Sequence, residues 1–354
     1  MGIRVLVVED SLTIRRYLAD LFASTPGFEV VGEADNGKTA IELCQQHRPD
    51  IITMDMMLPV MTGVAATEYI MAYCPTPILI VSASTNRGEL FKTYDALAAG
   101  AVDVLDKPSG DDLDDNWARE LLSAVRVVSK VKVITHPRAR LGALGRARET
   151  AVAPPQMLPS AKSYDIAAIG ASTGGPGAVL SLLGALPKDF ALPILLVIHI
   201  SERFGAALAE WLDGQTGFSV RYAVDGERLP EPGQRGVIMA PPGYHLEVRG
   251  RRLALSQGPE RHSCRPSVDV MFESLSREMG ARTAGVLLTG MGRDGAAGLL
   301  DIRRAGGLTI AQDEKTSIVW GMPGEAVHLG AASHVLPLGE IGPFLATLAE
   351  AGRP

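Results

Sequence analysis

Three polar side chains in the second half of the sequence have the types needed for nucleophilic catalysis, and each follows an apolar run. Ser172 lies in Gly-Ala-Ser-Thr-Gly, which matches the G-x-S-x-G turn that exposes a reactive serine between a strand and a helix. His199 comes directly after residues 193–198, and Asp294 lies in a glycine-rich loop after residues 284–288. A hydroxyl, an imidazole and a carboxylate at one edge of a sheet could form a Ser-His-Asp triad.

The turn at Ser172 has a second interpretation, because glycine-rich turns between a strand and a helix also bind dinucleotides. A dinucleotide fold places an acidic residue at the end of the next strand, about 20 residues beyond the loop, where it binds the ribose. Here the next apolar run ends in His199, and the turn lacks the Gly-Lys-Ser/Thr of a phosphate-binding loop. The sequence therefore favours a reactive serine over a nucleotide site.

Each member of this triad also has a structural interpretation. Ser172 could cap a helix, His199 could be a core histidine, and Asp294 could be a turn residue. His245 and His262 compete with His199 as the base, but neither directly ends an apolar parallel strand. We therefore assign these two histidines to the substrate face or to structure. The chain order Ser, His, Asp differs from the orders of α/β-hydrolases and serine proteases, so a true triad predicts a different fold.

Five polar residues in the first half also follow apolar runs. Glu9 and Asp10 follow the first run, Asp55 the third, Ser82 the fourth and Lys107 the fifth. Three carboxylates brought together repel one another and need a cation, and oxygen ligands suit Mg²⁺. The lysine and the hydroxyl would hold the oxygens of a phosphoryl group on Asp55. Caps and turns also use Asp and Ser, but the ordered set of matches makes that interpretation the weaker one.

Such sites require parallel sheets, because the carboxyl ends of parallel strands share one edge. Residues 1–130 alternate five apolar runs with five helical stretches, which predicts a doubly wound α/β domain. Residues 131–163 have scattered Arg, Pro, Gly and Ala without apolar periodicity, and we interpret them as a linker. A short helix near 139–149 is the one element that this linker could contain.

Residues 164–354 predict a second α/β domain, again a parallel sheet with helices on both faces. Helices are expected near 203–213 and near 340–351, and the alternation around Gly250 and Arg251 predicts a β-hairpin. The two domains share a fold class but show no internal repeat.

Composition places the chain among ordinary globular proteins: it has 354 residues, of which 46% are hydrophobic and 21% charged, and a formal net charge of −6. Residues 130–163 are basic, but neither α/β segment has the basic character of a nucleic-acid binder. No apolar run reaches the roughly 18 residues of a membrane span, and we find no signal peptide. Cys44, Cys74 and Cys264 are isolated and are interpreted as reduced thiols, which favours a cytoplasmic location.

Residues 1–130 resemble the receiver domain of response regulators. The matching stretches are Val-Val-Glu-Asp-Ser, Asp-Ile-Ile-Thr-Met-Asp-Met-Met-Leu-Pro, Val-Ser-Ala-Ser-Thr and Asp-Lys-Pro. The resemblance implies a flavodoxin-like fold that a histidine kinase phosphorylates. The roles it implies are phosphate acceptor for Asp55, Mg²⁺ ligands for Glu9, Asp10 and Asp55, and phosphate contacts for Ser82 and Lys107. Val104 departs from the family, in which this position is often aromatic.

Residues 164–354 resemble the catalytic domain of the chemotaxis protein-glutamate methylesterases, the CheB family. The matching stretches are Ile-Gly-Ala-Ser-Thr-Gly-Gly-Pro, Ala-Pro-Pro-Gly-Tyr-His-Leu-Glu-Val, Arg-Pro-Ser-Val-Asp-Val-Met-Phe, Leu-Thr-Gly-Met-Gly-Arg-Asp-Gly and Gln-Asp-Glu-Lys-Thr-Ser-Ile-Val-Trp-Gly-Met-Pro. The resemblance implies a Rossmann-like fold and a metal-free esterase site. The roles it implies are the triad for Ser172, His199 and Asp294, the oxyanion donor for the amide of Met291, and a nearby position for Thr173. Ile198 stands where a glutamine is common in the family.

Together the two resemblances imply an esterase that phosphorylation activates. Its substrates would be methylated glutamates of chemoreceptors, and the same site would also deamidate receptor glutamines, because an amide presents the same carbonyl. The unphosphorylated receiver is expected to cover the catalytic edge. The alternative function is a phosphorylation-switched binding module that lacks catalysis.

Overall fold

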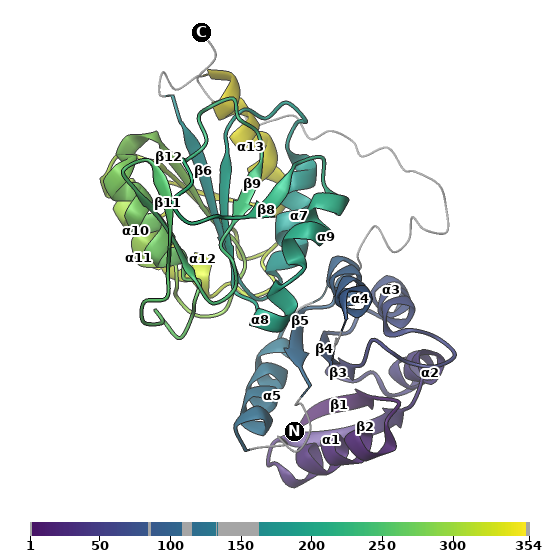
Figure 1. Ribbon diagram of the computed structural model, residues 1–354. Coiled ribbons are helices and arrows are strands. Elements are labelled where there is room, and N and C mark those ends of the chain that lie inside the picture. The colour runs from purple at the N-terminus through teal and green to yellow at the C-terminus, as the bar shows by residue number, and fades with distance from the viewer. Residues whose placement is uncertain (1, 84–85, 108–114, 132, 134–162, 352–354) are drawn as a thin grey trace. The chain divides into compact units, whose positions relative to one another are not determined.

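The structure is a computed structural model, and it describes residues 2–83, 86–107, 115–131, 133 and 163–351 (Figure 1). The chain divides into two compact units, Met1–Thr150 and Ala151–Pro354. The short helix expected near 139–149 lies outside the described residues. No helix in the described ranges is long and apolar enough to cross a membrane.

The first unit is built on a five-stranded parallel sheet with the order β2-β1-β3-β4-β5. Its strands are β1 (Ile3–Val8), β2 (Phe28–Ala34), β3 (Ile51–Met54), β4 (Ile78–Ser82) and β5 (Asp103–Asp106). β3 and β4 are buried along their whole length, as expected where helices cover both faces of a parallel sheet. This strand order is the flavodoxin-like order, so the fold predicted for the first domain is confirmed.

Five helices flank this sheet: α1 (Leu12–Ser24), α2 (Gly37–His47), α3 (Gly63–Tyr73), α4 (Arg87–Ala98) and α5 (Asp115–Val128). α1 and α5 are neighbours, because the rings of Tyr17 and Trp117 lie 6.2 Å apart, and α3 packs between α2 and α4 (Figure 1). The side chains of Asn36, Thr62 and Asn86 accept backbone N–H groups at the starts of α2, α3 and α4. These caps explain where the three helices begin.

The second unit contains a seven-stranded parallel sheet with the order β14-β13-β12-β6-β7-β9-β8. Its strands are β6 (Ile166–Ala171), β7 (Ile194–Ile198), β8 (Val220–Tyr222), β9 (Val237–Met239), β12 (Thr283–Leu287), β13 (Leu308–Gln312) and β14 (His334–Leu336). The strand order reverses at β6, which lies between β7 and β12. Ligand sites of open parallel sheets form at such a reversal, beyond the carboxyl ends of the strands.

The helices of the second unit are α7 (Gly175–Ala185), α8 (Glu202–Gly205), α9 (Leu208–Gln215), α10 (Val268–Glu278), α11 (Ala296–Arg304), α12 (Met322–His328) and α13 (Leu338–Ala351), with a short 3₁₀ turn at Gly280–Arg282. α7 packs with α13, and α11 packs between α10 and α12. The main core cluster joins the sheet to the group formed by α10, α11 and α12, through residues such as Phe272, Leu287 and Leu299, all fully buried.

The prediction of a single helix near 203–213 is wrong, because α8 and α9 are separate helices. Gly205 closes α8, and a Cβ there would lie 2.4 Å from a Pro242 side-chain carbon. Ala207 then leaves the helical conformation, with φ −119° and ψ 5°, before α9 starts. The break between the two helices therefore coincides with the close approach of Pro242, and the helix propensities of the local sequence do not predict it.

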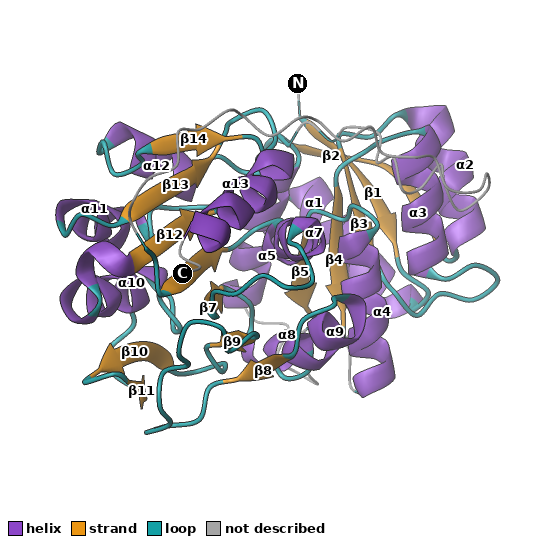
Figure 2. Cartoon of the chain, turned by 90° about the horizontal axis from the view of Figure 1, so that it is seen from above, coloured by secondary structure: helices purple, strands orange, loops and turns teal. Residues whose placement is uncertain are grey.

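The β-hairpin predicted around Gly250 and Arg251 is confirmed. β10 (His245–Arg249) and β11 (Arg252–Ser256) pair antiparallel, and Gly250 and Arg251 both adopt positive φ at the turn. The hairpin lies beside α10, where the Ser274 hydroxyl accepts the Val248 N–H at 3.0 Å (Figure 2).

Candidate active site

Ser172 occupies the turn between the central strand β6 and helix α7. Gly174 has φ 75°, a conformation that glycine adopts without strain, and the Gly175 N–H donates to the Ser172 carbonyl at 2.6 Å. The Ser172 N–H donates to the Thr289 carbonyl at 3.0 Å, which ties the turn to the loop after β12. Ser172 is partly exposed, so its hydroxyl lies at an accessible strand end next to a helix N-terminus.

The sheet register brings His199 beside Ser172. Ala171 at the end of β6 pairs with Ile198 at the end of β7, and the His199 N–H donates to the Ala171 carbonyl at 3.0 Å. Ser172 and His199 each come one residue later, so they are neighbours on adjacent strand ends. Ile198, the residue that departs from the family pattern, is buried within β7.

Asp294 completes a hydrogen-bonded pair with His199. Its Oδ2 lies 2.8 Å from His199 Nε2 and also accepts the Val268 N–H at 2.6 Å. Its Oδ1 accepts the Ser267 hydroxyl at 2.7 Å and the Asp269 N–H at 3.2 Å. The carboxylate is only 2% exposed, and these donors fix its orientation, with Oδ2 facing the imidazole.

His199 and Asp294 each shift the pKa of the other. Burial lowers the pKa of His199, but the hydrogen bond to Asp294 and contact with Cys264 outweigh it and raise this pKa to about 9. Burial likewise opposes ionisation of Asp294, yet the hydrogen bonds from His199, Ser267 and Val268 hold its pKa below the ordinary value of 3.8. Because Nε2 faces Asp294, Nδ1 is the ring nitrogen turned away from the carboxylate, and it lies 3.6 Å from Cys264 Sγ. Within the described residues the Ser172 hydroxyl makes no hydrogen bond, an arrangement common before substrate binds.

The loop after β12 forms the other wall of the site. A Cβ on Gly290 would lie 2.7 Å from the Ser172 Cβ and 2.3 Å from Met322 Sδ, so only glycine lets this loop approach the serine. The next residue, Met291, has a backbone N–H that donates to none of the described residues, and its side chain is 52% exposed. Thr173 is buried and its carbonyl accepts the Thr289 hydroxyl at 3.0 Å. A backbone N–H without a partner among the described residues, in the loop that Gly290 brings next to Ser172, is the type of donor that an oxyanion site uses.

The two competing histidines are both engaged elsewhere. His245 is 3% exposed, with Nε2 3.0 Å from the Pro259 carbonyl and Nδ1 accepting the Ser267 N–H at 3.1 Å. His262 Nε2 lies 3.1 Å from Asp269 Oδ2. These hydrogen bonds hold both imidazoles within the fold; their assignment to the substrate face or to structure stays a prediction.

Two contributors to the site were missed at the sequence level. Ser267 caps α10 and also holds Asp294, and only the first role has a sequence signal, because the residue precedes an apolar helical stretch. The sequence indicates an isolated thiol at Cys264, yet its Sγ lies 3.6 Å from His199 Nδ1. No local pattern links residues so far apart in the chain.

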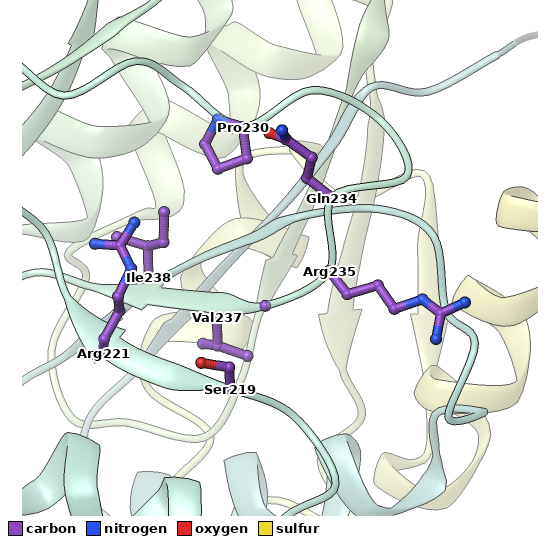
Figure 3. A pocket seen from close by; sticks show the side chains of 8 residues that line it. Ser219, Arg221, Pro230, Gln234, Arg235, Val237 and Ile238 are labelled. Carbon is purple, nitrogen blue, oxygen red and sulfur yellow. The ribbon is translucent and has the colours of Figure 1, made fainter.

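A separate pocket of the second unit lies at the opposite end of its strands (Figure 3). It is formed where β8 and β9 begin, and the Arg221 guanidinium on its wall is paired with Glu227 at 2.8 Å. Its lining residues are Ser219, Arg221, Pro230, Gln234, Arg235, Gly236, Val237 and Ile238. None of the predicted catalytic residues lines it.

In the first unit, the polar residues at the strand ends gather around Lys107. Its Nζ lies 2.7 Å from Glu9 Oε2 and 3.1 Å from Asp55 Oδ1, and all three side chains are buried. Ligand oxygens of Glu9, Asp10 and Asp55 lie within 4.8 Å of one another. Ser82, at the end of β4, is 1% exposed.

The electrostatics of this cluster fit a divalent cation. Burial raises the pKa of Asp55, and it raises the pKa of Glu9 to about 7, although Lys107 opposes both changes. The pKa of Lys107 is raised because its carboxylate partners outweigh burial. One lysine thus leaves the three carboxylates undercompensated, and their oxygen donors are the type that Mg²⁺ prefers.

The two folds and their polar sites define a class of protein: a response regulator with an enzymatic output domain. Residues 167–345 match the CheB methylesterase family, and residues 5–115 match the response regulator receiver domain. The chain belongs to the CheB methylesterase family, and the predicted family and fold class are both confirmed.

Full-length relatives and a solved domain agree with this assignment. A protein-glutamate methylesterase/protein-glutamine glutaminase of Nitrosospira multiformis is 42% identical over 99% of this chain and 98% of that protein. One from Syntrophus aciditrophicus is 41% identical over 99% of this chain and all of that protein. The crystal structure of the CheB methylesterase catalytic domain of Thermotoga maritima is 35% identical, with a TM-score of 0.50, and covers 53% of this chain and 100% of that domain.

Proposed function

We propose that this chain is a receiver-controlled protein-glutamate methylesterase and protein-glutamine glutaminase, with Ser172 as nucleophile, His199 as base and Asp294 as the group that orients the imidazole. The observation that carries the proposal is the 2.8 Å contact between His199 and Asp294, at the strand end next to Ser172. The names of its full-length relatives support the substrate class.

In the proposed reaction the Ser172 oxygen attacks the ester carbonyl while Nδ1 of His199 takes the hydroxyl proton. The carbonyl oxygen becomes negative and accepts the Met291 N–H, with Thr173 lining the same side. The imidazolium then gives its proton to the departing methoxide, which leaves as methanol. Water hydrolyses the acyl-enzyme by the same proton transfers. With a glutamine substrate the leaving group is ammonia.

The receiver carries the proposed switch. Asp55 is the proposed acceptor of a phosphoryl group from a histidine kinase, and Glu9, Asp10 and Asp55 would hold Mg²⁺, which would supply positive charge for the transfer. Lys107 and Ser82 contact the phosphoryl oxygens. The buried ion pairs of Lys107 with Glu9 and Asp55 support these roles, because they place the ammonium beside the acceptor carboxylate.

The proposed boundaries are 1–130 for the receiver, 131–163 for the linker and 164–354 for the esterase domain. The proposed partners are a histidine kinase and methylated chemoreceptors, without nucleic acid and without insertion into a membrane. The three free cysteines support a reducing, cytoplasmic location.

Substitution of the nucleophile tests the esterase assignment. Ser172→Ala is expected to lower methanol release from a methylated receptor by more than about a thousandfold, because the triad acts as a unit. Ser181→Ala, on the exposed side of α7, is the matched control and should retain activity. Substantial release by folded Ser172→Ala would show that another group is the nucleophile.

A further inference from the structure

The sulfur atom of Cys264 lies beside Nδ1 of His199, the nitrogen that the proposed mechanism uses to take the Ser172 proton. Nε2 of His199 is occupied by Asp294 at 2.8 Å, and Nδ1 lies 3.6 Å from the Sγ of Cys264. A thiol, an imidazole and a carboxylate thus lie in sequence, which is the arrangement that activates a cysteine nucleophile. Cys264 Sγ also lies 3.4 Å from the His262 carbonyl, so the thiol has two acceptors, and one of them is the imidazole that the proposed mechanism assigns to Ser172.

Cys264 is held in this position by a tight turn. Arg261 and Cys264 exchange backbone hydrogen bonds of 3.1 and 2.9 Å, and His262 and Ser263 between them both adopt positive φ. The Arg261 guanidinium is anchored to α10 by the Glu273 carboxylate at 2.6 and 3.1 Å. The turn therefore presents the thiol to the imidazole from a fixed position.

The other two cysteines provide an internal comparison. Cys44 and Cys74 are buried in the first unit, with their sulfur atoms 3.8 Å apart. Cys264 is partly exposed, and its Sγ contacts the His199 imidazole. A hydrogen bond with Cys74 lowers the pKa of Cys44 to about 7, but Cys44 and Cys74 are almost fully buried, so reagents from solvent should reach and modify Cys264 first.

We propose that Cys264 is a redox modification site, and that its oxidation by a peroxide stops the esterase. The inference rests on the proposed role of His199. The thiol proton moves to Nδ1, and the thiolate attacks one peroxide oxygen. An S–O bond forms as the O–O bond breaks, so sulfur is oxidised and peroxide reduced. The departing hydroxide takes the proton from the imidazolium and leaves as water. Cys264 becomes a sulfenic acid, whose added oxygen occupies the space beside Nδ1.

The test treats the full chain with hydrogen peroxide and follows two quantities: methanol release, and dimedone labelling of each cysteine by mass spectrometry. Cys264 should be labelled at least about ten times faster than Cys44 and Cys74, because Cys264 is partly exposed and the other two thiols are buried. Methanol release should fall in parallel with this labelling, and dithiothreitol should restore it.

Variants separate this site from other peroxide damage. Each variant is scored by the ratio of its own activities with and without peroxide, so its basal rate does not matter. Cys264→Ala should give a ratio near one, whereas Cys44→Ala should lose activity as the unsubstituted chain does. If Cys264→Ala is as peroxide-sensitive as the unsubstituted chain, or if labelling does not favour Cys264, the proposal is wrong.

A measurement that needs no esterase activity distinguishes failure of this proposal from failure of the proposed function. Alkylation of Cys264 by iodoacetamide should slow by at least about tenfold in His199→Ala, and also in Asp294→Asn, because the imidazole no longer draws off the thiol proton. Equal alkylation rates in the folded variants would overturn the activation of Cys264, whatever the result with Ser172→Ala.

Discussion

Asp294→Asn is the substitution that examines the triad most closely, because it keeps the shape of the side chain and removes its charge. Both carboxylate oxygens accept hydrogen bonds: Oδ2 from His199 and the Val268 N–H, and Oδ1 from Ser267 and the Asp269 N–H. The amide nitrogen of asparagine cannot accept any of them. The amide nitrogen fits best in the place of Oδ1, because the Ser267 hydroxyl can rotate there and accept a hydrogen bond from it.

The size of the effect follows from the imidazolium that forms in the transition state. Burial lowers the pKa of His199, and Asp294, together with Cys264, raises it to about 9, above its ordinary value of 6.5. A return to that ordinary value removes about 3 kcal/mol of imidazolium stabilisation, at about 1.4 kcal/mol per pKa unit. This corresponds to a rate loss of about a hundredfold. If the amide nitrogen instead turns toward His199 and reverses its tautomer, the loss approaches about 10⁴-fold.

The assay is methanol release from a methylated receptor between pH 6 and pH 10. The rate of the unsubstituted chain should rise with pH through about 9, where His199 loses its proton, and the rise should move to lower pH in Asp294→Asn. Asp301→Asn is the control, because this partly exposed α11 carboxylate lies outside the site. Urea unfolding is measured in parallel, since mismatched buried donors cost about 1–3 kcal/mol. A folded Asp294→Asn that keeps a third of the activity with an unchanged pH profile would refute this reasoning.

Two further predictions concern pH and the receiver. The raised pKa of His199 contributes stability that is fully present below pH 6.5 and is lost as the pH rises through about 9. The lowered pKa of Asp294 contributes stability that is lost as the pH falls below 3.8. Urea unfolding of the full chain, measured against pH, should show both losses in the transition of the second unit, and Asp294→Asn should lack them. With a small-molecule phosphodonor and Mg²⁺, Asp55→Asn should abolish phosphoryl labelling, whereas the control Asp20→Asn on α1 should be labelled normally. Glu9→Gln should raise the Mg²⁺ concentration needed for labelling by about tenfold or more. Labelling that survives Asp55→Asn would exclude Asp55 as the acceptor.

The sequence predicted the folds and the strand-end positions of the candidate site residues for one physical reason. A strand buried on both faces reads as a short apolar run, and the first polar residue after it lies at the edge of the sheet. Ser172 and His199 could therefore be placed at neighbouring strand ends. Parallel pairing of β6 with β7 and β12 then brings these ends together.

Contacts that depend on tertiary structure could not be predicted in this way. Cys264 and His199 are 65 positions apart, and Ser267 and Asp294 are 27 apart. Residues 261–267 have neither helical nor strand periodicity, so their sequence gives no information about which strand end they approach. The break between α8 and α9 has the same origin, because it accompanies a contact with Pro242 rather than a local breaker signal.

The support beneath Ser172 shows why its motif alone carries limited information. The Thr289 carbonyl accepts the Ser172 N–H, and the Thr289 hydroxyl donates to the Thr173 carbonyl and accepts the Val319 N–H at 2.9 Å. The Thr289 N–H in turn donates to Gln312 Oε1 at 2.8 Å, and both side chains are fully buried. A fully satisfied buried network of this kind permits one arrangement of the turn, since every alternative leaves a polar group unpaired. The glycines make the turn possible, and Thr289 and Gln312 fix the backbone conformation of the turn that carries Ser172.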